Sequence, residues 1–148
     1  NRLDRDTTGA LILAKNPYSA AVLSAQMKQR QIRRTYLAIV QGIAPEQGTI
    51  DAPIGRAADS TIERQVDFAN GESAVTHYER LATYHSYSLI ELHLETGRTH
   101  QDPCAYEVHW TSAAGDFLYN PDYRIIKRQP LHSFQLEFAH PVQEKTCV

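Results

Sequence analysis

Two stretches in which apolar and polar residues alternate constrain this chain to a structure built mainly on a β-sheet. The longer stretch, AVTHYERLATYHSYSLIELHLETG, begins at Ala74. One face of its second half carries Ile90, Leu92 and Leu94, and the other carries Leu89, Glu91 and His93. A period of two residues is the pattern of an extended strand with one dry side. The HSY in its middle therefore predicts a hairpin.

The second alternating stretch, HSFQLEFAHP, lies near the C-terminus. Its expected faces are Phe134, Leu136 and Phe138 on one side and Ser133, Gln135 and Glu137 on the other, up to Pro141. Residues 10–14 are expected to form a short buried strand, and TYLAIVQG and GTIDAPIGR further strands. In NPYSAAVLSAQMKQRQ, Asn16 is placed as the N-cap and Pro17 as the first residue of a helix.

We expect the 148 residues to form a single folded unit with both helix and strand patterns, because the sequence has no repeats or low-complexity tracts. The expected fold class is α+β, with a mixed, largely antiparallel sheet and few helices. Cys104 and Cys147 are too far apart to suggest a disulfide framework or a metal knuckle. No apolar run approaches a membrane span, so we expect a cytoplasmic protein.

The net charge of −2 gives no overall basic signature, so nucleic-acid binding would have to come from local clustering. Such a cluster lies in KQRQIRRTY. Its cations are Lys28, Arg30, Arg33 and Arg34, and Arg56 and Arg64 follow in a polar stretch. Basic residues are also favoured at an exposed helix end by the helix dipole, and the residues alone leave these two explanations equally weighted.

The opening stretch NRLDRDTTG carries two carboxylates. For Asp6 we favour a role in a turn before the first strand. Asp4 lies between two arginines, which would keep a partly buried carboxylate ionised as a nucleophile or base. Structural ion pairs imitate active sites often enough that the composition alone favours the structural role for Asp4.

The segments RLDRDTTGALILAK, RRTYLAIVQG, GTIDAPIGR, AVTHYERL, LHLETGRTHQ, GDFLYN and LHSFQLEFAHP occur in this order. In this respect the chain resembles the RluA/RluD-type RNA pseudouridine synthases over nearly its whole length. The resemblance implies isomerisation of uridine to pseudouridine in structured RNA, ribosomal or transfer RNA. It implies no metal and no other cofactor, and RNA as the partner. We also expect a monomer.

The same resemblance assigns roles to single residues. Asp4 matches the family's catalytic aspartate, which attacks the ribose C1′ or the base of a flipped nucleotide. Arg2 matches the arginine that fills the space left by that base, and Tyr36 the tyrosine that packs on it. From the residues alone, Tyr36 would more simply be an ordinary aromatic of the sheet. The basic cluster at Arg30, Arg33 and Arg34, with Arg56, is expected to contact RNA phosphates.

Three departures from the family pattern matter for function. Asn1 stands where the family has histidine, and residues 1–148 are expected to be a single, partial catalytic domain without an N-terminal RNA-binding domain. Pro103 stands where the family has the arginine that pairs with the catalytic aspartate. Arg98 is the nearby cation that could replace it. These departures motivate an alternative: a non-catalytic RNA-binding relic of the same fold.

Residues 102–114 form a segment that departs from the family pattern. Cys104 and His109 lie in it, His100 precedes it and Cys147 lies downstream, and together these residues invite a metal site. The spacing fits no standard zinc site, so we expect none.

Overall fold

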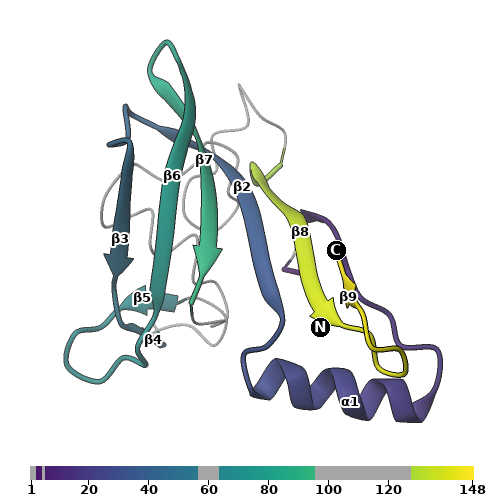
Figure 1. Cartoon of the computed structure of the whole chain (residues 1–148). Helices are drawn as coiled ribbons and strands as arrows, with labels where there is room; N and C mark the ends of the chain where they lie inside the picture. The colour runs from purple at the N-terminus through teal and green to yellow at the C-terminus, as the bar shows by residue number, and fades with distance from the viewer. Residues whose placement is uncertain (1–2, 5, 57–63, 96–127) are drawn as a thin grey trace.

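Most strands of the chain join one sheet, which dominates the view in Figure 1. The computed structural model describes residues 3–4, 6–56, 64–95 and 128–148, and for Arg56, Arg64 and Gln65 it describes the backbone only. Within these ranges the strand order of the main sheet is β1-β8-β2-β7-β6-β3, and β9 pairs with β8. The bounds are β1 Thr8–Gly9, β2 Arg33–Gln41, β3 Gln47–Asp51, β6 Val75–Tyr84, β7 Tyr87–Leu94, β8 Leu131–Ala139 and β9 Thr146–Cys147.

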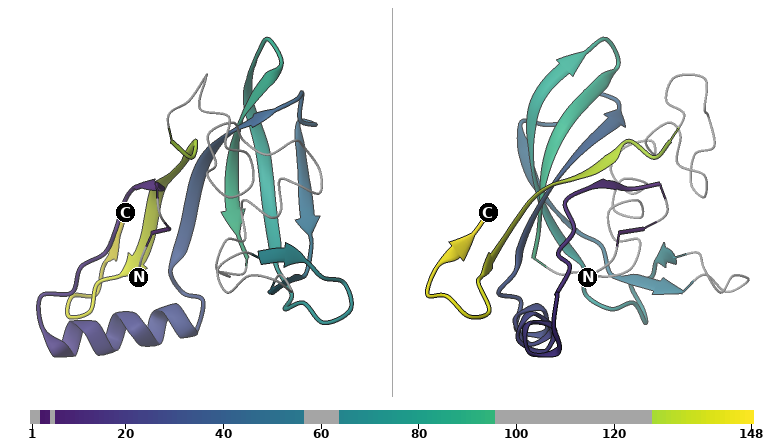
Figure 2. Two further views of the ribbon diagram at one scale, coloured as in Figure 1. Left: turned by 180° about the vertical axis from the view of Figure 1, so that it is seen from behind. Right: turned by 90° about the vertical axis from the view of Figure 1, so that its right-hand side faces the viewer.

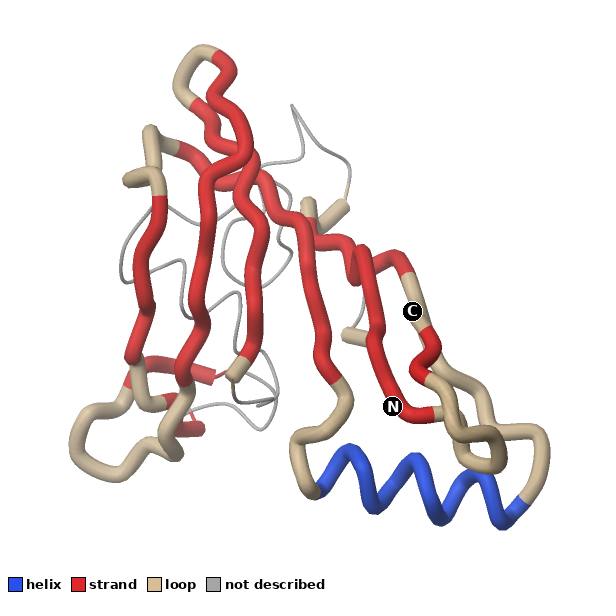
Figure 3. The backbone as a smooth tube through the Cα atoms, viewed as in Figure 1, coloured by secondary structure: helices blue, strands red, loops and turns tan. Residues whose placement is uncertain are grey.

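The main sheet is mixed and largely antiparallel, as the alternation predicts. β1 runs parallel to β8, whereas the other pairs of the described sheet are antiparallel. The two short strands β4 (Ile54–Arg56) and β5 (Arg64–Val66) form a separate antiparallel pair. Figure 3 shows the long strands side by side, with the hairpin between β6 and β7 extending beyond them at one end. The predicted hairpin is confirmed, and its turn residue His85 has a positive φ of 51°.

Helix α1 (Pro17–Lys28) begins where the sequence predicts. The side chain of Asn16 accepts a hydrogen bond of 2.8 Å from the backbone N–H of Ser19, which satisfies one free donor of the first turn. The helix lies across the foot of β2 and β8 (Figures 1 and 2). Gln26 attaches it there, because its amide donates to the Ala139 carbonyl at 2.9 Å and accepts from the Ala139 N–H at 3.1 Å. No helix in the described ranges has the length and apolarity needed to cross a membrane.

The main core lies on one face of this sheet, called here the inner face. It receives alternate side chains from the central strands, as expected from a period of two residues. Ile90 and Leu92 are fully buried and Leu94 packs against them, so the predicted apolar face of β7 is confirmed. The buried cluster consists of Tyr36, Ala38, Val40, Ala44, Ile50, Ala52, Tyr78, Ile90, Leu92 and Leu131.

Two predictions, one for β8 and one for the segment after β1, are wrong. The alternation placed Phe134 on the apolar face of β8 and Ser133 on the polar face, but Phe134 is 53% exposed and Ser133 is buried. The reason is a β-bulge: Thr35 pairs with Gln135 but Tyr36 pairs with Ser133, so Phe134 is an extra residue that reverses the alternation of β8.

The expected strand at residues 10–14 is the second error. β1 ends at Gly9, and Leu13 is 78% exposed. The ladder between β1 and β8 stops at Ser133, directly before the bulge, so the apolar run that follows has no regular partner in β8.

Candidate active site and basic cavity

A single cross-strand row on the inner face contains Tyr36. Neighbouring strands contribute one directly opposed residue each, in the order Gly9, Ser133, Tyr36, Leu92, Tyr78 and Gly48. Tyr36 is 8% exposed and belongs to the core cluster. The structure therefore places this predicted site residue at the centre of the sheet, on the face where the core lies.

The segment that carries Asp4 is held against β8 by contacts on both sides of Gly9. The Thr7 hydroxyl donates to Gln129 Oε1 at 3.0 Å, and the Thr8 hydroxyl is hydrogen-bonded to His132 Nδ1 at 2.8 Å. The N–H of Ala10 donates to the Ser133 carbonyl at 2.8 Å. Thr8 thus anchors the segment to β8, the strand that borders Tyr36, and Thr7 anchors it to Gln129, two residues before that strand.

Asp4 lies at the start of a tight turn. Its carbonyl accepts a hydrogen bond of 3.1 Å from the N–H of Thr7, and its side chain is half-buried. Asp6 adopts a φ of 66° within this turn, a region in which Asp is better tolerated than most residues. The expected turn is confirmed. Gly9 then occupies the row two strands from Tyr36, a separation of about 10 Å at the usual strand spacing.

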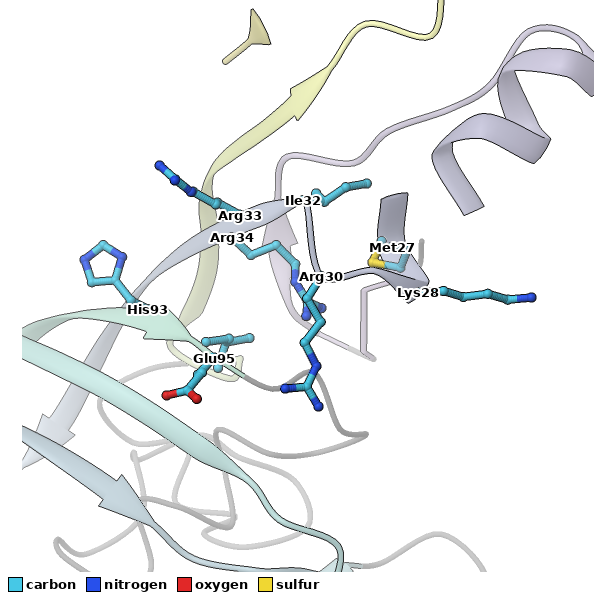
Figure 4. Close-up of a pocket in the computed structure, with 9 residues that line it drawn as sticks. Met27, Lys28, Arg30, Ile32, Arg33, Arg34, His93 and Glu95 are labelled. Atoms are coloured by element: carbon cyan, nitrogen blue, oxygen red, sulfur yellow. The ribbon is translucent and has the colours of Figure 1, made fainter. Parts of the chain in front are cut away.

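The predicted basic cluster surrounds a cavity of about 400 Å³ at the end of α1 and the start of β2. The cavity is lined by Met27, Lys28, Arg30, Ile32, Arg33, Arg34, His93, Leu94 and Glu95. Figure 4 shows Arg30 and Arg34 extending toward one side, while Arg33 points to the other. Arg33 is 80% exposed and lies 3.5 Å from a carboxylate oxygen of Glu137. The structure therefore brings Arg30 and Arg34 together and separates Arg33 from them.

The remaining predicted site residues lie wholly or partly outside the described part of the chain. Arg2, Arg98 and Pro103 lie outside the described residues. The same holds for His100, Cys104 and His109, the residues of the metal site that their spacing argues against. The backbone of Arg56 belongs to β4, where it is paired with Arg64 of β5. The cation expected to face Asp4 therefore stays a prediction.

Two residues of the inner row were not singled out from the sequence. Ser133 has a buried hydroxyl without a hydrogen-bond partner within the described residues. Tyr78 lies over Gly48, and burial raises the pKa of its hydroxyl above the usual value. No local sequence signal marks them, because their positions follow from strand register and from the bulge at Phe134.

Comparison with known proteins gives matches that cover most of the chain. The family model described as RNA pseudouridylate synthase matches residues 1–101. The Bacillus subtilis protein named RNA pseudouridine synthase YjbO is 41% identical over 145 residues, which cover 97% of this chain and 51% of that protein. Ribosomal large subunit pseudouridine synthase D of Zymomonas mobilis is 39% identical over 162 residues, covering 98% of this chain and 49% of that protein. This chain spans about half the length of both relatives.

Among solved structures, Human RNA Pseudouridylate Synthase Domain Containing 1 aligns with a TM-score of 0.89 at 25% sequence identity. The alignment covers 99% of this chain and 66% of that one. The expected fold class, α+β with a largely antiparallel sheet, is confirmed by this likeness and by the strand pairing. The family match over most of the chain and the shared fold lead to one conclusion: the chain belongs to the RNA pseudouridylate synthase family.

Proposed function

We propose that this chain carries the catalytic centre of an enzyme that isomerises uridine to pseudouridine in structured RNA. Membership of the family supports the reaction. Relatives named ribosomal large subunit pseudouridine synthase D, from Zymomonas mobilis and Nitrosomonas europaea, support ribosomal RNA as the first substrate to test. Transfer RNA is the second, and the proposed setting is a cytoplasmic monomer that needs RNA as its only partner.

The proposed nucleophile is the carboxylate of Asp4, because aspartate is ionised at neutral pH and needs positioning more than activation. Its attack on the ribose C1′ or on the base would allow the bond between C1′ and N1 to break. The uracil would then turn, C5 would form the new bond to C1′, and the bond formed by Asp4 would break to free its carboxylate. C5 loses its proton in this exchange and N1 gains one, so no oxidant, reductant or metal is required.

The supporting residues have distinct proposed roles. Arg2 would occupy the gap that the flipped nucleotide leaves in the RNA, since a guanidinium both stacks on bases and pairs with phosphate. Tyr36 would pack its ring against the target base and assist the proton transfer. Arg98 is proposed as the cation beside Asp4, in place of the arginine that Pro103 replaces.

Arg30, Arg33, Arg34 and Arg56 are proposed to hold the RNA through its phosphates. A chain with a net charge of −2 needs such a local concentration of cations to bind a polyanion. The binding would then weaken with rising salt concentration, because each neutralised phosphate releases counterions.

The observation that carries the proposal is the attachment of the Asp4 segment to the strand beside Tyr36. Gly9, Ser133 and Tyr36 occupy one row, and Thr7 and Thr8 hold the chain there through 3.0 Å and 2.8 Å hydrogen bonds. This attachment supports a shared site for the nucleophile Asp4 and the base-stacking ring of Tyr36. The two residues are 32 positions apart, so the sequence alone does not require them to be close.

The test is tritium release from large-subunit ribosomal RNA and from bulk transfer RNA, both labelled at C5 of uridine. We expect the chain to release tritium and Asp4→Asn to release none, while the variant still binds RNA. Asp6→Asn is the matched control, because Asp6 belongs to the turn and has no proposed role in the chemistry.

Other outcomes would be equally informative. Release from transfer RNA alone would overturn ribosomal RNA as the substrate. RNA binding without release by either protein would favour the non-catalytic relic. Release that persists in Asp4→Asn would remove Asp4 as nucleophile.

A further inference from the structure

Two arginines at the basic cavity differ from the other arginines whose side chains are described. Arg33 faces Glu137, Arg80 faces Glu46 and the Ala44 carbonyl, and Arg128 donates to backbone carbonyls. Arg30 and Arg34 make no ion pair with any described residue. The Nε atom of Arg34 is also buried without a hydrogen-bond partner there. A buried donor of a charged group without a partner is costly and calls for a ligand.

Arg30 is held in a backbone conformation that favours glycine. The N–H of Gln31 bonds the Gln26 carbonyl at 2.9 Å, and the N–H of Arg30 bonds the Met27 carbonyl at 3.2 Å. This pair of bonds is the Schellman motif, and Arg30 occupies its left-handed position with a φ of 57°. A side chain there is disfavoured relative to glycine. Arginine at this position therefore lowers stability while adding a cation to the cavity.

The charge of the lining favours an anion. Arg33 pairs with Glu137, but Lys28, Arg30 and Arg34 still outnumber Glu95, the one carboxylate among the described lining residues. Glu95 is also engaged elsewhere, since its Oε2 lies 3.0 Å from Nε2 of His77. The helix dipole accounts for cations at the end of α1, as at Lys28, but it does not account for the buried Nε of Arg34 on β2.

The position of Arg34 links the cavity to the proposed site. Arg34 and Tyr36 lie two residues apart on β2, so their side chains leave the sheet on the same face, about 7 Å apart along the strand. An extended RNA strand advances by about the same length per nucleotide. A phosphate at Arg34 would thus be adjacent to a base at Tyr36.

We infer that this cavity binds one backbone phosphodiester of the RNA, adjacent to the target nucleotide, through Arg30 and Arg34. The inference rests on the proposed function and refines it. Arg30 and Arg34 form the phosphate site, whereas Arg33 is occupied by Glu137 on the other face. A guanidinium pair suits a phosphodiester because planar N–H donors match its two free oxygens.

The test uses the whole chain and a fluorescein-labelled nine-nucleotide RNA of cytidines with one central uridine. Binding is measured by anisotropy over a series of salt concentrations. Arg34→Gln is expected to bind about tenfold more weakly, with a salt slope reduced by about 1. Arg30→Gly should also weaken binding but raise the Tm, because glycine suits the Schellman position. Weaker binding in a more stable protein cannot come from misfolding.

Lys15→Gln is the matched control. It removes one positive charge at the opposite end of α1 from Arg30, about 18 Å away along the helix. We expect its affinity to stay within twofold of the unmodified chain. If Arg30→Gly and Arg34→Gln behave like Lys15→Gln while the unmodified chain binds RNA, the phosphate site is wrong and the proposed function stands. If the unmodified chain does not bind RNA and releases no tritium, the proposed function itself fails.

A second binding experiment identifies which anion the cavity holds. A neutral methylphosphonate replaces the linkage on one side of the uridine and then on the other. The unmodified chain should lose affinity at one linkage, and Arg34→Gln should show no further loss there. Equal insensitivity at both linkages would overturn the inference. Binding of inorganic phosphate as tightly as the RNA would assign the cavity to a small anion instead.

Discussion

Gly9 packs against the backbone of Ser133 so closely that a Cβ on Gly9 would lie 2.1 Å from the Ser133 carbonyl oxygen. Its φ of 117° is also a conformation that L side chains rarely adopt. Gly9→Ala is therefore expected to lower the free energy of unfolding by about 3 kcal/mol, as strain and displacement of a β8 contact combine. Urea unfolding followed by circular dichroism measures it.

Gly42→Ala is the control for this prediction. Gly42 has a similar φ of 104°, but a Cβ there would meet nothing within 4 Å. We expect a loss of only about 1 kcal/mol from backbone strain. Equal losses at Gly9 and Gly42 would contradict a specific role for the contact with Ser133.

Ser133 and Ser88 are both buried serines, but replacing each by alanine should change stability in opposite directions. The Ser133 hydroxyl has no hydrogen-bond partner within the described residues, so Ser133→Ala should raise the free energy of unfolding by about 1 kcal/mol. The Ser88 hydroxyl accepts from Ala44 at 2.9 Å and donates to the Gly42 carbonyl at 2.8 Å. Ser88→Ala should therefore cost about 2 kcal/mol. A loss at Ser133 would indicate that its hydroxyl has a ligand.

Stability is expected to fall at alkaline pH through Tyr78. Burial raises the pKa of its hydroxyl above the usual 10.0, so above that pH the unfolded chain releases this proton while the folded chain keeps it. The stabilisation is complete below the unfolded pKa and is lost as pH rises through the folded pKa. Tyr78→Phe should flatten this decline in urea midpoints measured up to about pH 11. Tyr84→Phe, which removes a hydroxyl at a 75% exposed position, is the matched control.

Gln26 should contribute to stability through the backbone of β8. Its side chain makes both hydrogen bonds of the Ala139 peptide groups, at 2.9 Å and 3.1 Å. Gln26→Ala leaves these groups without partners and is expected to cost about 2 kcal/mol. Gln29→Ala tests an exposed glutamine at the end of the same helix and should stay within about 0.5 kcal/mol of the unmodified chain. A cost at Gln26 no larger than at Gln29 would show that α1 is held by other contacts.

The sequence correctly predicted those features of helices and strands that depend only on neighbouring residues. Asn16 and Pro17 mark the start of α1 because capping and a fixed φ are properties of neighbouring residues. The alternation around Ile90 and Leu92 predicted the buried face of β7 because period-two burial needs no knowledge of the partner strand. The same logic failed at Phe134, where the bulge is defined only relative to β2.

The candidate site likewise has features that the sequence predicts and features that depend on strand pairing. The residue types of the site could be read from the sequence: the Asp4 motif, Tyr36 on a strand, and a cluster of arginines before it. Strand pairing in the folded chain brings Gly9, Ser133 and Tyr36 into one row. It also puts Arg34 at the cavity and pairs Arg33 with Glu137, which the sequence does not indicate. The physical reason is that cross-strand register and burial depend on residues far apart in the chain. Periodicity sets which face a side chain takes, but pairing sets what it meets there.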